Sequence, residues 1–209
     1  VFNGDFVDRG SFSVEVVTTL LAFMLAFPRH FVLTRGNHET KQMSAVYGFA
    51  GEVRHKLDGD VLDAYYHVFQ ALPLAAVVAD RCLVVHGGLP ADDGVKLAAI
   101  EQLDRFREPP DGGGLMSDLL WADPQPFPGR SPSKRGVGKM FGPDVTQAFL
   151  RDNGLELLIR SHEVRDEGYS VEHGGRCVTV FSAPNYCDQM GNKAAIARVS
   201  LRADWADDD

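Results

Sequence analysis

Several polar residues with metal-binding or acid–base chemistry stand directly after short apolar segments of the chain. These residues are Asp5 and Asp8, Asn37 and His38, His86, and His162. A carboxylate, an amide oxygen and two imidazoles suit Mn²⁺, Fe²⁺ or Zn²⁺, with coordination positions left open for water. The absence of any Cys-x-x-Cys spacing argues against a closed structural zinc site. The pattern therefore predicts an open, catalytic metal site.

A single histidine is more often a hydrogen-bonded structural residue than a metal ligand. We expect that structural role for His30, His55, His67 and His173. The other histidines differ because each follows an apolar segment and has glycine, asparagine or acidic neighbours.

The elements that must position these side chains form a repeated strand, loop and helix pattern. Residues 1–3 are strand-like, residues 5–10 form a polar loop, and Ser11 is expected to cap a helix that ends at Phe27, before Pro28. Residues 31–33 form a second short strand that leads into a polar loop over 35–39. Two such units in succession predict a layered α/β fold with its site at the carboxyl ends of the strands.

Further strands bring the remaining histidines to strand ends. The pattern predicts a helix over 51–72, a hairpin of strands 74–79 and 82–85, a helix from Gly142 to Arg151, and strands over 155–159 and 177–181. The stretches around 109–114 and 124–133 are predicted to be surface loops, with 119–121 as a short apolar anchor between them.

Composition limits the classes of protein that fit. A chain of 209 residues, 44% hydrophobic, forms one domain or two small ones. The net charge of −8 argues against broad nucleic-acid binding. The longest apolar run, 14–27, is too short to span a bilayer and is predicted to be a core helix. Three cysteines without a paired spacing favour a reducing compartment, the cytosol or the nucleus.

Several sequence blocks together resemble the phosphoprotein phosphatase family of metallophosphoesterases. The blocks are residues 4–10, 35–39, 86–89, 120–124, 133–137, 160–163 and 182–188. Among its subfamilies, the serine/threonine phosphatases of type five are most similar, on residues 4–15 and 187–193. The resemblance implies an α/β fold with a central β-sandwich flanked by helices, a catalytic domain over 1–203 and an acidic tail over 204–209.

The resemblance also implies roles for individual residues. Asp5 would bridge two divalent metals (Mn, Fe or Zn), and Asn37, His86 and His162 would complete the ligands of one of them. His38 would protonate the leaving oxygen, and Asp8 would orient its imidazole. The residues implied to bind the substrate phosphate are Arg9, Asn37, His38, Arg135 and Tyr186. Cys187 would lie on a loop at the mouth of the site.

One family block, Gly-Asp-x-His-Gly, does not occur in this sequence. In the family this block supplies ligands to the other metal, so we expect one complete metal site and poor turnover from the chain as printed. The fold would correspondingly lack its first strand and helix, and we expect the chain to be a fragment of a larger enzyme with an upstream regulatory region.

The leading hypothesis is therefore a metal-dependent protein serine/threonine phosphatase that acts on phosphoproteins, with regulatory domains or subunits as partners and no nucleic acid or membrane. One alternative is a catalytically impaired module of the same fold that binds phosphate or serves as a scaffold. A second, less favoured, is a nucleotide polyphosphate hydrolase. A Rossmann nucleotide binder is disfavoured because no G-x-G-x-x-G follows a strand.

Overall fold

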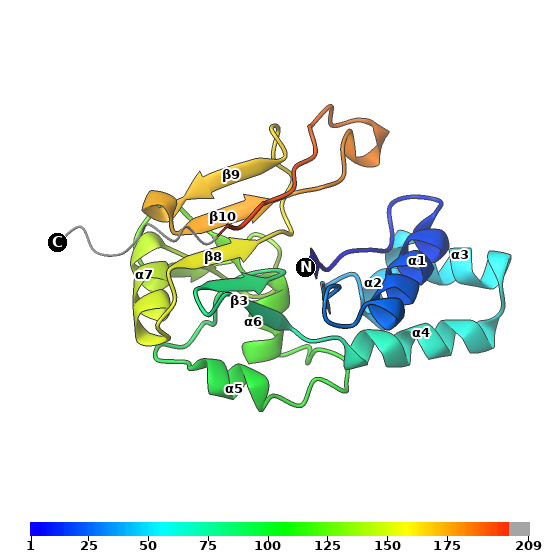
Figure 1. Ribbon diagram of the computed structural model, residues 1–209, viewed down its shortest axis with the longest axis horizontal. Helices are drawn as coiled ribbons and strands as arrows, with labels where there is room; N and C mark the ends of the chain where they lie inside the picture. The colour runs from blue at the N-terminus through cyan, green and yellow to red at the C-terminus, as the bar shows by residue number, and fades with distance from the viewer. Residues whose placement is uncertain (201–209) are drawn as a thin grey trace.

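The computed structural model describes residues 1–200 (Figure 1). The α-helices are α1 (Ser13–Ala26), α2 (Lys41–Tyr47), α3 (Phe49–Lys56), α4 (Gly59–Ala71), α5 (Leu97–Glu101), α6 (Leu115–Trp121) and α7 (Pro143–Asp152). The strands are β1 (Phe2–Asn3), β2 (Leu33–Thr34), β3 (Ala75–Val78), β4 (Cys82–Val85), β5 (Asp123–Pro124), β6 (Arg130–Pro132), β7 (Lys139–Phe141), β8 (Leu157–Arg160), β9 (Tyr169–Glu172) and β10 (Cys177–Val180). Short 3-10 turns are η1 (His173–Gly175) and η2 (Tyr186–Asp188). The predicted tail over 204–209 lies outside the described residues.

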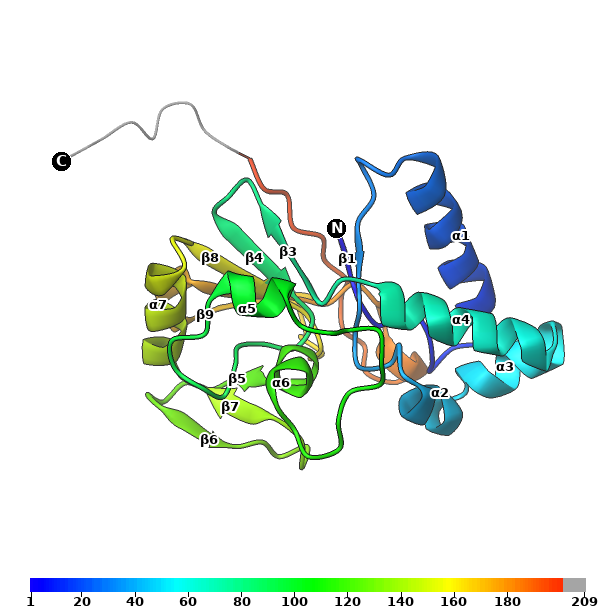
Figure 2. The ribbon, with the colours of Figure 1, turned by 90° about the horizontal axis from the view of Figure 1, so that it is seen from below.

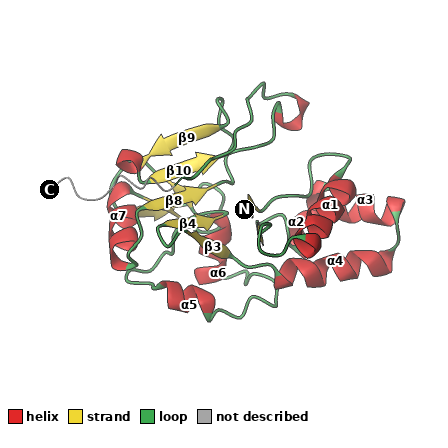
Figure 3. Cartoon of the chain, viewed as in Figure 1, coloured by secondary structure: helices red, strands yellow, loops and turns green. Residues whose placement is uncertain are grey.

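The strands form three sheets, and the largest has the order β3-β4-β8-β10-β9 (Figure 3). Within it β4, β8 and β10 are parallel neighbours, while β3 and β9 run antiparallel at the two edges. The strands β1 and β2 form a separate parallel pair joined through α1, and β5-β7-β6 form the third sheet. This arrangement confirms the predicted α/β class, in which the parallel strands deliver their carboxyl ends to one edge.

Two hydrophobic cores divide the molecule. One lies between the five-stranded sheet and the layer of α6, α7 and β7, and its members include Leu83, Leu158, Leu120 and Phe149. The other joins β2 to α1, α3 and α4 around Phe49, a residue with no exposed surface. In Figure 2 the helices α1 to α4 lie on one side of β1 and the five-stranded sheet on the other.

Two predicted helices differ from the observed ones. Ser11 is not the cap of α1, because the helix begins at Ser13 and its first amides are satisfied from α3, whose Glu52 accepts the N–H groups of Ser13 (3.2 Å) and Val14 (2.9 Å). The predicted helix over 51–72 is two helices. Asp58 takes an extended conformation between them and accepts the Val61 amide with its side chain, which starts α4 anew.

The helix α1 is apolar on more than one face, and the prediction that it is a core helix is wrong for much of its surface. Val14 and Val17 are buried, whereas Phe23 and Leu25 are 44% and 79% exposed. Among the described residues, only one side of the helix is packed, mainly against α3. None of the helices in residues 1–200 combines the length and apolar character needed to cross a membrane.

The remaining predictions place most elements to within a few residues. The predicted hairpin is β3 and β4, paired antiparallel from Ala75 opposite Val85 to Val78 opposite Cys82. The apolar anchor at 119–121 proves to be the end of α6, whose Leu119 and Leu120 are fully buried. Sequence patterns did not predict β9, the short sheet of β5, β6 and β7, or the helices α2 and α5.

Candidate active site

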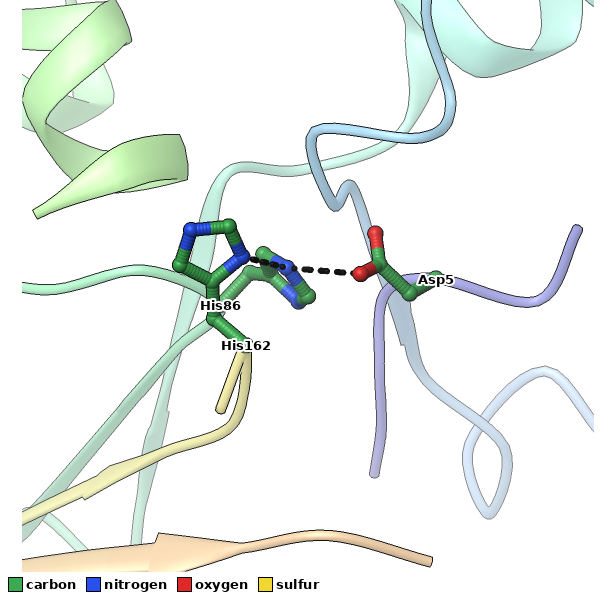
Figure 4. A group of neighbouring side chains, drawn as sticks. All are labelled: Asp5, His86 and His162. Atoms are coloured by element: carbon green, nitrogen blue, oxygen red, sulfur yellow. Dashed lines mark hydrogen bonds and ion pairs between the residues drawn. The ribbon is translucent and has the colours of Figure 1, made fainter. Parts of the chain in front are cut away.

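Four strand ends bring the predicted ligand residues together. The loop after β1 carries Asp5, the loop after β2 carries Asn37, and β4 and β8 lead to His86 and His162. One ligand atom each from Asp5, His86 and His162 lies within 4.8 Å of the others. In Figure 4 the two imidazoles and the Asp5 carboxylate face one another across the end of the sheet. The predicted convergence of these residues is confirmed.

The centre of this group is the Nε2 atom of His86. It lies 3.0 Å from Asn37 Oδ1, 3.2 Å from His162 Nδ1 and 3.2 Å from Asp5 Oδ2. On the other side of the ring, Nδ1 lies 2.7 Å from the backbone oxygen of Asn3. A carbonyl oxygen only accepts hydrogen bonds, so Nδ1 carries a proton and Nε2 is the ring nitrogen that faces the other residues of the group.

This donor set fits a metal ion. The Asn37 amide oxygen and the Asp5 carboxylate supply oxygen ligands, and an imidazole nitrogen that carries no proton can add its lone pair to them. Burial first, and then the neighbouring positive groups, lower the pKa of His162 well below its ordinary value, which favours the neutral ring. Oxygen and imidazole donors in this combination are ligands that divalent metal ions accept. Asp5, Asn37, His86 and His162 are therefore the residues that would hold such an ion.

Two glycines permit the loops to approach this closely. Gly4 has φ +75°, and a Cβ atom there would lie 2.8 Å from Nδ1 of His86. A Cβ at Gly36 would overlap the Asp5 carboxylate and would lie 2.7 Å from Oε2 of Glu39. Any side chain at either position would push apart the loops that carry Asp5 and Asn37.

Glu39 is a fully buried carboxylate that ties these two loops together. It accepts the backbone N–H groups of Asp5 (2.8 Å), Phe6 (2.7 Å) and Gly36 (2.7 Å). Burial, and then the charge of Asp5, raise the pKa of Glu39 to about 7. Burial also acts to raise the pKa of Asp5, but the positive charge and hydrogen bonds of His86 and His38 outweigh it, and the net pKa is lowered.

Replacing Glu39 by glutamine is expected to lower the free energy of unfolding by about 1–3 kcal/mol, because one of the two oxygens becomes an NH₂ group that cannot accept an amide. Urea denaturation of the metal-free chain measures this change. The matched control is Glu156→Gln, whose side chain is 58% exposed in a pair with Arg81, and which should alter stability by less than about 1 kcal/mol. Equal changes in the free energy of unfolding for the two substitutions would contradict the role of Glu39 in holding the two loops together.

His38 and Asp8 form a pair beside the ligand group. Nδ1 of His38 lies 2.6 Å from Oδ2 of Asp8, whose side chain is fully buried. The other carboxylate oxygen of Asp8 accepts the backbone N–H of Phe49 at 2.8 Å, which fixes its orientation. Burial alone would lower the pKa of His38, but the hydrogen bond to Asp8 and the charges of Asp5 and Asp8 outweigh burial and raise it. The pair therefore favours a protonated imidazole, as a proton donor requires.

Three of the five residues predicted to bind phosphate, Arg9, Arg135 and Tyr186, contribute side chains that are not in the ligand group. Arg9 lies over the ring of Tyr47, with its Cζ 4.0 Å from the ring centroid. Tyr186 lies close enough to Arg9 for that cation to lower its pKa, although burial is the larger influence and raises the pKa overall. Arg135 donates from Nε to Asp123 at 2.6 Å and from Nη2 to the backbone oxygen of His162 at 3.3 Å.

Several of these residues adopt the left-handed backbone conformation, which residues other than glycine rarely take. The φ angles are +56° at Asp5, +74° at Asp8, +65° at Arg9 and +70° at His162. Conformations of this kind persist only where the surrounding structure enforces them, and they gather at functional sites. Their concentration at the strand ends supports a site in this part of the molecule.

A buried arginine network underlies the histidine side of the site. Arg160 is fully buried and donates to the backbone oxygen of Gly87 (2.7 Å), to Asp123 (2.7 Å) and to Glu163 (2.7 Å). Asp123 in turn holds Arg135. The Arg160 guanidinium thus connects Gly87 and Glu163, which follow His86 and His162, with Asp123. Asp123 is the partner of Arg135, a predicted phosphate-binding residue.

Sequence reasoning assigned no role to four residues that shape the site. They are Asn3, Glu39, Tyr47 and Arg160. Glu39 and Arg160 stand inside the recognised sequence blocks, so the blocks were a usable signal for these two. Tyr47 and Asn3 carry no sequence signal, because their contacts arise only when distant loops meet.

The residues predicted to be structural lie away from the centre. His173 donates or accepts at both ring nitrogens, with Thr146 (2.8 Å) and the backbone oxygen of Gln125 (2.9 Å) as partners. His30, His55 and His67 are exposed. Within the described part of the chain, Cys82, Cys177 and Cys187 form no disulfide, and Cys187 is partly exposed.

The sequence matches a known protein family and named relatives. A family model described as calcineurin-like phosphoesterase matches residues 1–166. The chain is 63% identical over 198 residues to serine/threonine-protein phosphatase 5 of Arabidopsis thaliana, which covers 95% of this chain and 37% of that protein. It is 61% identical over 195 residues to serine/threonine-protein phosphatase 5 of Homo sapiens, covering 93% of this chain and 39% of that protein.

A solved structure gives the same likeness in three dimensions. It is described as a protein serine/threonine phosphatase from Saccharomyces cerevisiae with similarity to human phosphatase PP5, and it superposes with a TM-score of 0.88 at 46% identity. The match covers 91% of this chain and 60% of that one. The chain spans about two fifths of the length of the curated relatives it matches.

Proposed function

The chain belongs to the calcineurin-like phosphoesterase family, and from this premise we propose that it is a metal-dependent phosphatase acting on phosphoserine and phosphothreonine in proteins. The observation that carries the proposal is the convergence of Asp5, Asn37, His86 and His162 beside His38, whose imidazole is paired with the buried Asp8 carboxylate. The printed names of the relatives, serine/threonine-protein phosphatases 5 and T, support the substrate class.

Each site residue has a proposed role in the hydrolysis reaction. Asp5, Asn37, His86 and His162 would hold a divalent cation, which would stabilise charge on the phosphoryl oxygens and lower the pKa of a water molecule so that it can lose a proton and attack phosphorus as hydroxide. His38 would give its proton to the departing serine or threonine oxygen, and Asp8 would hold the imidazole in position. Arg9 and Arg135 would hold phosphate oxygens with planar guanidinium groups, which offsets the acidic surroundings. Tyr186 would contact the same phosphate.

The printed chain offers one full ligand set, so we propose that it binds one metal ion tightly. Imidazole nitrogens with carboxylate and amide oxygens accept Mn, Fe or Zn, and we propose an ion of this class. We further propose phosphoproteins as substrates, regulatory domains or subunits as partners, and a cytoplasmic or nuclear location, the last supported by the free cysteines.

The test combines metal binding with phosphate release. Titration of the 209-residue chain with Mn²⁺ by calorimetry is expected to give a stoichiometry of one, and a phosphoserine peptide is expected to lose phosphate only when Mn²⁺ is present. Asp5→Asn should abolish both metal binding and phosphate release. His67 is an exposed histidine on α4, and His67→Asn should leave both measurements unchanged.

Each failure identifies a different alternative. Tight binding of inorganic phosphate without any hydrolysis would replace the enzyme by a phosphate-binding module. Faster hydrolysis of a dinucleotide polyphosphate than of the phosphopeptide would favour a nucleotide hydrolase. Two tightly bound ions in the 209-residue chain would contradict the single-site proposal.

A further inference from the structure

We propose that Asn3 is a positioning residue whose side chain aligns the two halves of the metal site, an inference that deepens the proposed function and rests on it for the identity of the ligands. Asn3 ends β1, between the helical half of the molecule and the five-stranded sheet (Figure 2). Neither the sequence blocks nor the charge pattern of the chain points to it.

The side-chain amide of Asn3 both donates and accepts hydrogen bonds. Nδ2 donates to the backbone oxygen of Val85 at 2.8 Å and to Oγ of Ser161 at 3.0 Å. Oδ1 accepts from Oγ1 of Thr34 at 2.8 Å. Both N–H groups and one lone pair are therefore engaged, and no other side-chain type of this size offers two donors and an acceptor in one plane.

The partners of Asn3 are the segments that carry the metal ligands. Val85 directly precedes His86, and Ser161 directly precedes His162. Thr34 ends β2, the strand that leads to Asn37, and Asn3 itself leads to Asp5 through Gly4. A single amide thus connects all four ligand segments.

These contacts matter because the ligands come from different halves. Asp5 and Asn37 follow β1 and β2, whose packing belongs to the core around Phe49, while His86 and His162 follow strands of the other core. The strands β1 and β2 pair only with each other among the described strands. Side-chain hydrogen bonds such as those of Asn3 must therefore set the offset between the two ligand pairs.

The main chain of Asn3 adds a second function. Its carbonyl oxygen accepts from Nδ1 of His86 at 2.7 Å, which orients the imidazole so that Nε2 faces the other ligands. A shift of β1 after loss of the side-chain contacts would weaken this bond and leave the orientation of the ring less restrained. Partners of this kind, one step removed from the ion, typically change metal affinity by about 10- to 100-fold when they are removed.

The experiment compares two asparagines with matched hydrogen bonding. Asn153, at the end of α7, donates from Nδ2 to the backbone oxygens of Val95 (3.1 Å) and Phe149 (3.0 Å) and accepts the Leu97 amide at 2.9 Å, and none of these partners adjoins a metal ligand. For Asn3→Leu, the Kd for Mn²⁺ measured by calorimetry is expected to rise about 10- to 100-fold. For Asn153→Leu, thermal stability should fall while the Kd stays within about twofold of the original chain.

A second measurement requires no metal. Nitrogen-15 NMR of the histidine side chains in the metal-free chain is expected to show a hydrogen-bonded Nδ1–H in His86, and Asn3→Leu should weaken or remove this signal. Should Asn3→Leu fail to fold, Ser161→Ala and Thr34→Val each remove one of its contacts, and each is expected to raise the Kd by a smaller factor.

The outcomes separate the two proposals. An original chain that binds no Mn²⁺, with a His86 Nδ1–H signal that still depends on Asn3, would overturn the proposed function and leave the positioning role in place. A folded Asn3→Leu chain with unchanged Kd and an unchanged His86 Nδ1–H signal would overturn the positioning role. So would an equal rise of the Kd in Asn153→Leu.

Discussion

Replacing His38 by asparagine is expected to lower kcat for a phosphoserine peptide by about 10²- to 10⁴-fold, the range typical of losing a positioned general acid. The alkoxide of serine is a poor leaving group unless it is protonated, and His38 is the protonatable group that Asp8 holds at 2.6 Å next to the ligands. The Kd for Mn²⁺ should stay nearly unchanged, because the ligand atoms themselves remain. Steady-state kinetics with Mn²⁺ measures the change.

The leaving group provides an internal control for this prediction. A nitrophenolate departs without protonation, so the His38→Asn chain should lose far less activity on p-nitrophenyl phosphate than on the peptide. His30→Asn, a substitution of an exposed histidine, should change neither rate. Equal losses on the two substrates would exclude His38 as the proton donor and would favour a role in binding.

Replacing Arg160 by methionine is expected to lower the free energy of unfolding by about 3–5 kcal/mol, because removal of one member of a buried ionic group leaves its partners uncompensated. Arg160 is fully buried, and its contacts with Asp123 and Glu163 are both 2.7 Å long. Methionine fills part of the space but offers nothing to either carboxylate or to the Gly87 carbonyl oxygen. Urea denaturation of the metal-free chain measures the loss.

A surface arginine provides the comparison. Arg81 and Glu156 form an ion pair at 2.8 Å in which the side chains are 52% and 58% exposed. Arg81→Met should change stability by less than about 1 kcal/mol, since solvent screens such pairs. A similarly small effect of Arg160→Met would mean that Asp123 and Glu163 are sufficiently neutralised by Arg135 and Arg165, the other arginines that contact them.

The convergence of the residues expected to bind metal could be predicted because local signals mark them. Asp5, Asn37, His86 and His162 each follow a short apolar strand, and parallel strands deliver their ends to one edge of a sheet. The fold class and the family likeness were also predicted, and the family model and the solved relative confirm both. The roles of these four residues as metal ligands stay predictions, as do the roles of His38, Asp8, Arg9, Arg135 and Tyr186.

The predictions from sequence were wrong or incomplete where contacts between distant residues determine the structure. Ser11 looked like a helix cap, but Glu52 of a different helix satisfies the first amides of α1. The break between α3 and α4 depends on Asp58, whose capping signal is masked by the helical pattern on either side. Asn3 and Glu39 were not identified because their function lies in contacts with residues far along the chain.

The division of the ligand set between two separately packed cores has a thermodynamic consequence. An ion that binds ligands from both cores is a noncovalent crosslink, and occupancy adds to the stability of the arrangement that it bridges by mass action. At a free concentration one hundred times the Kd, this linkage amounts to about 2.7 kcal/mol. Removal of such an ion by a chelator would withdraw this contribution to stability.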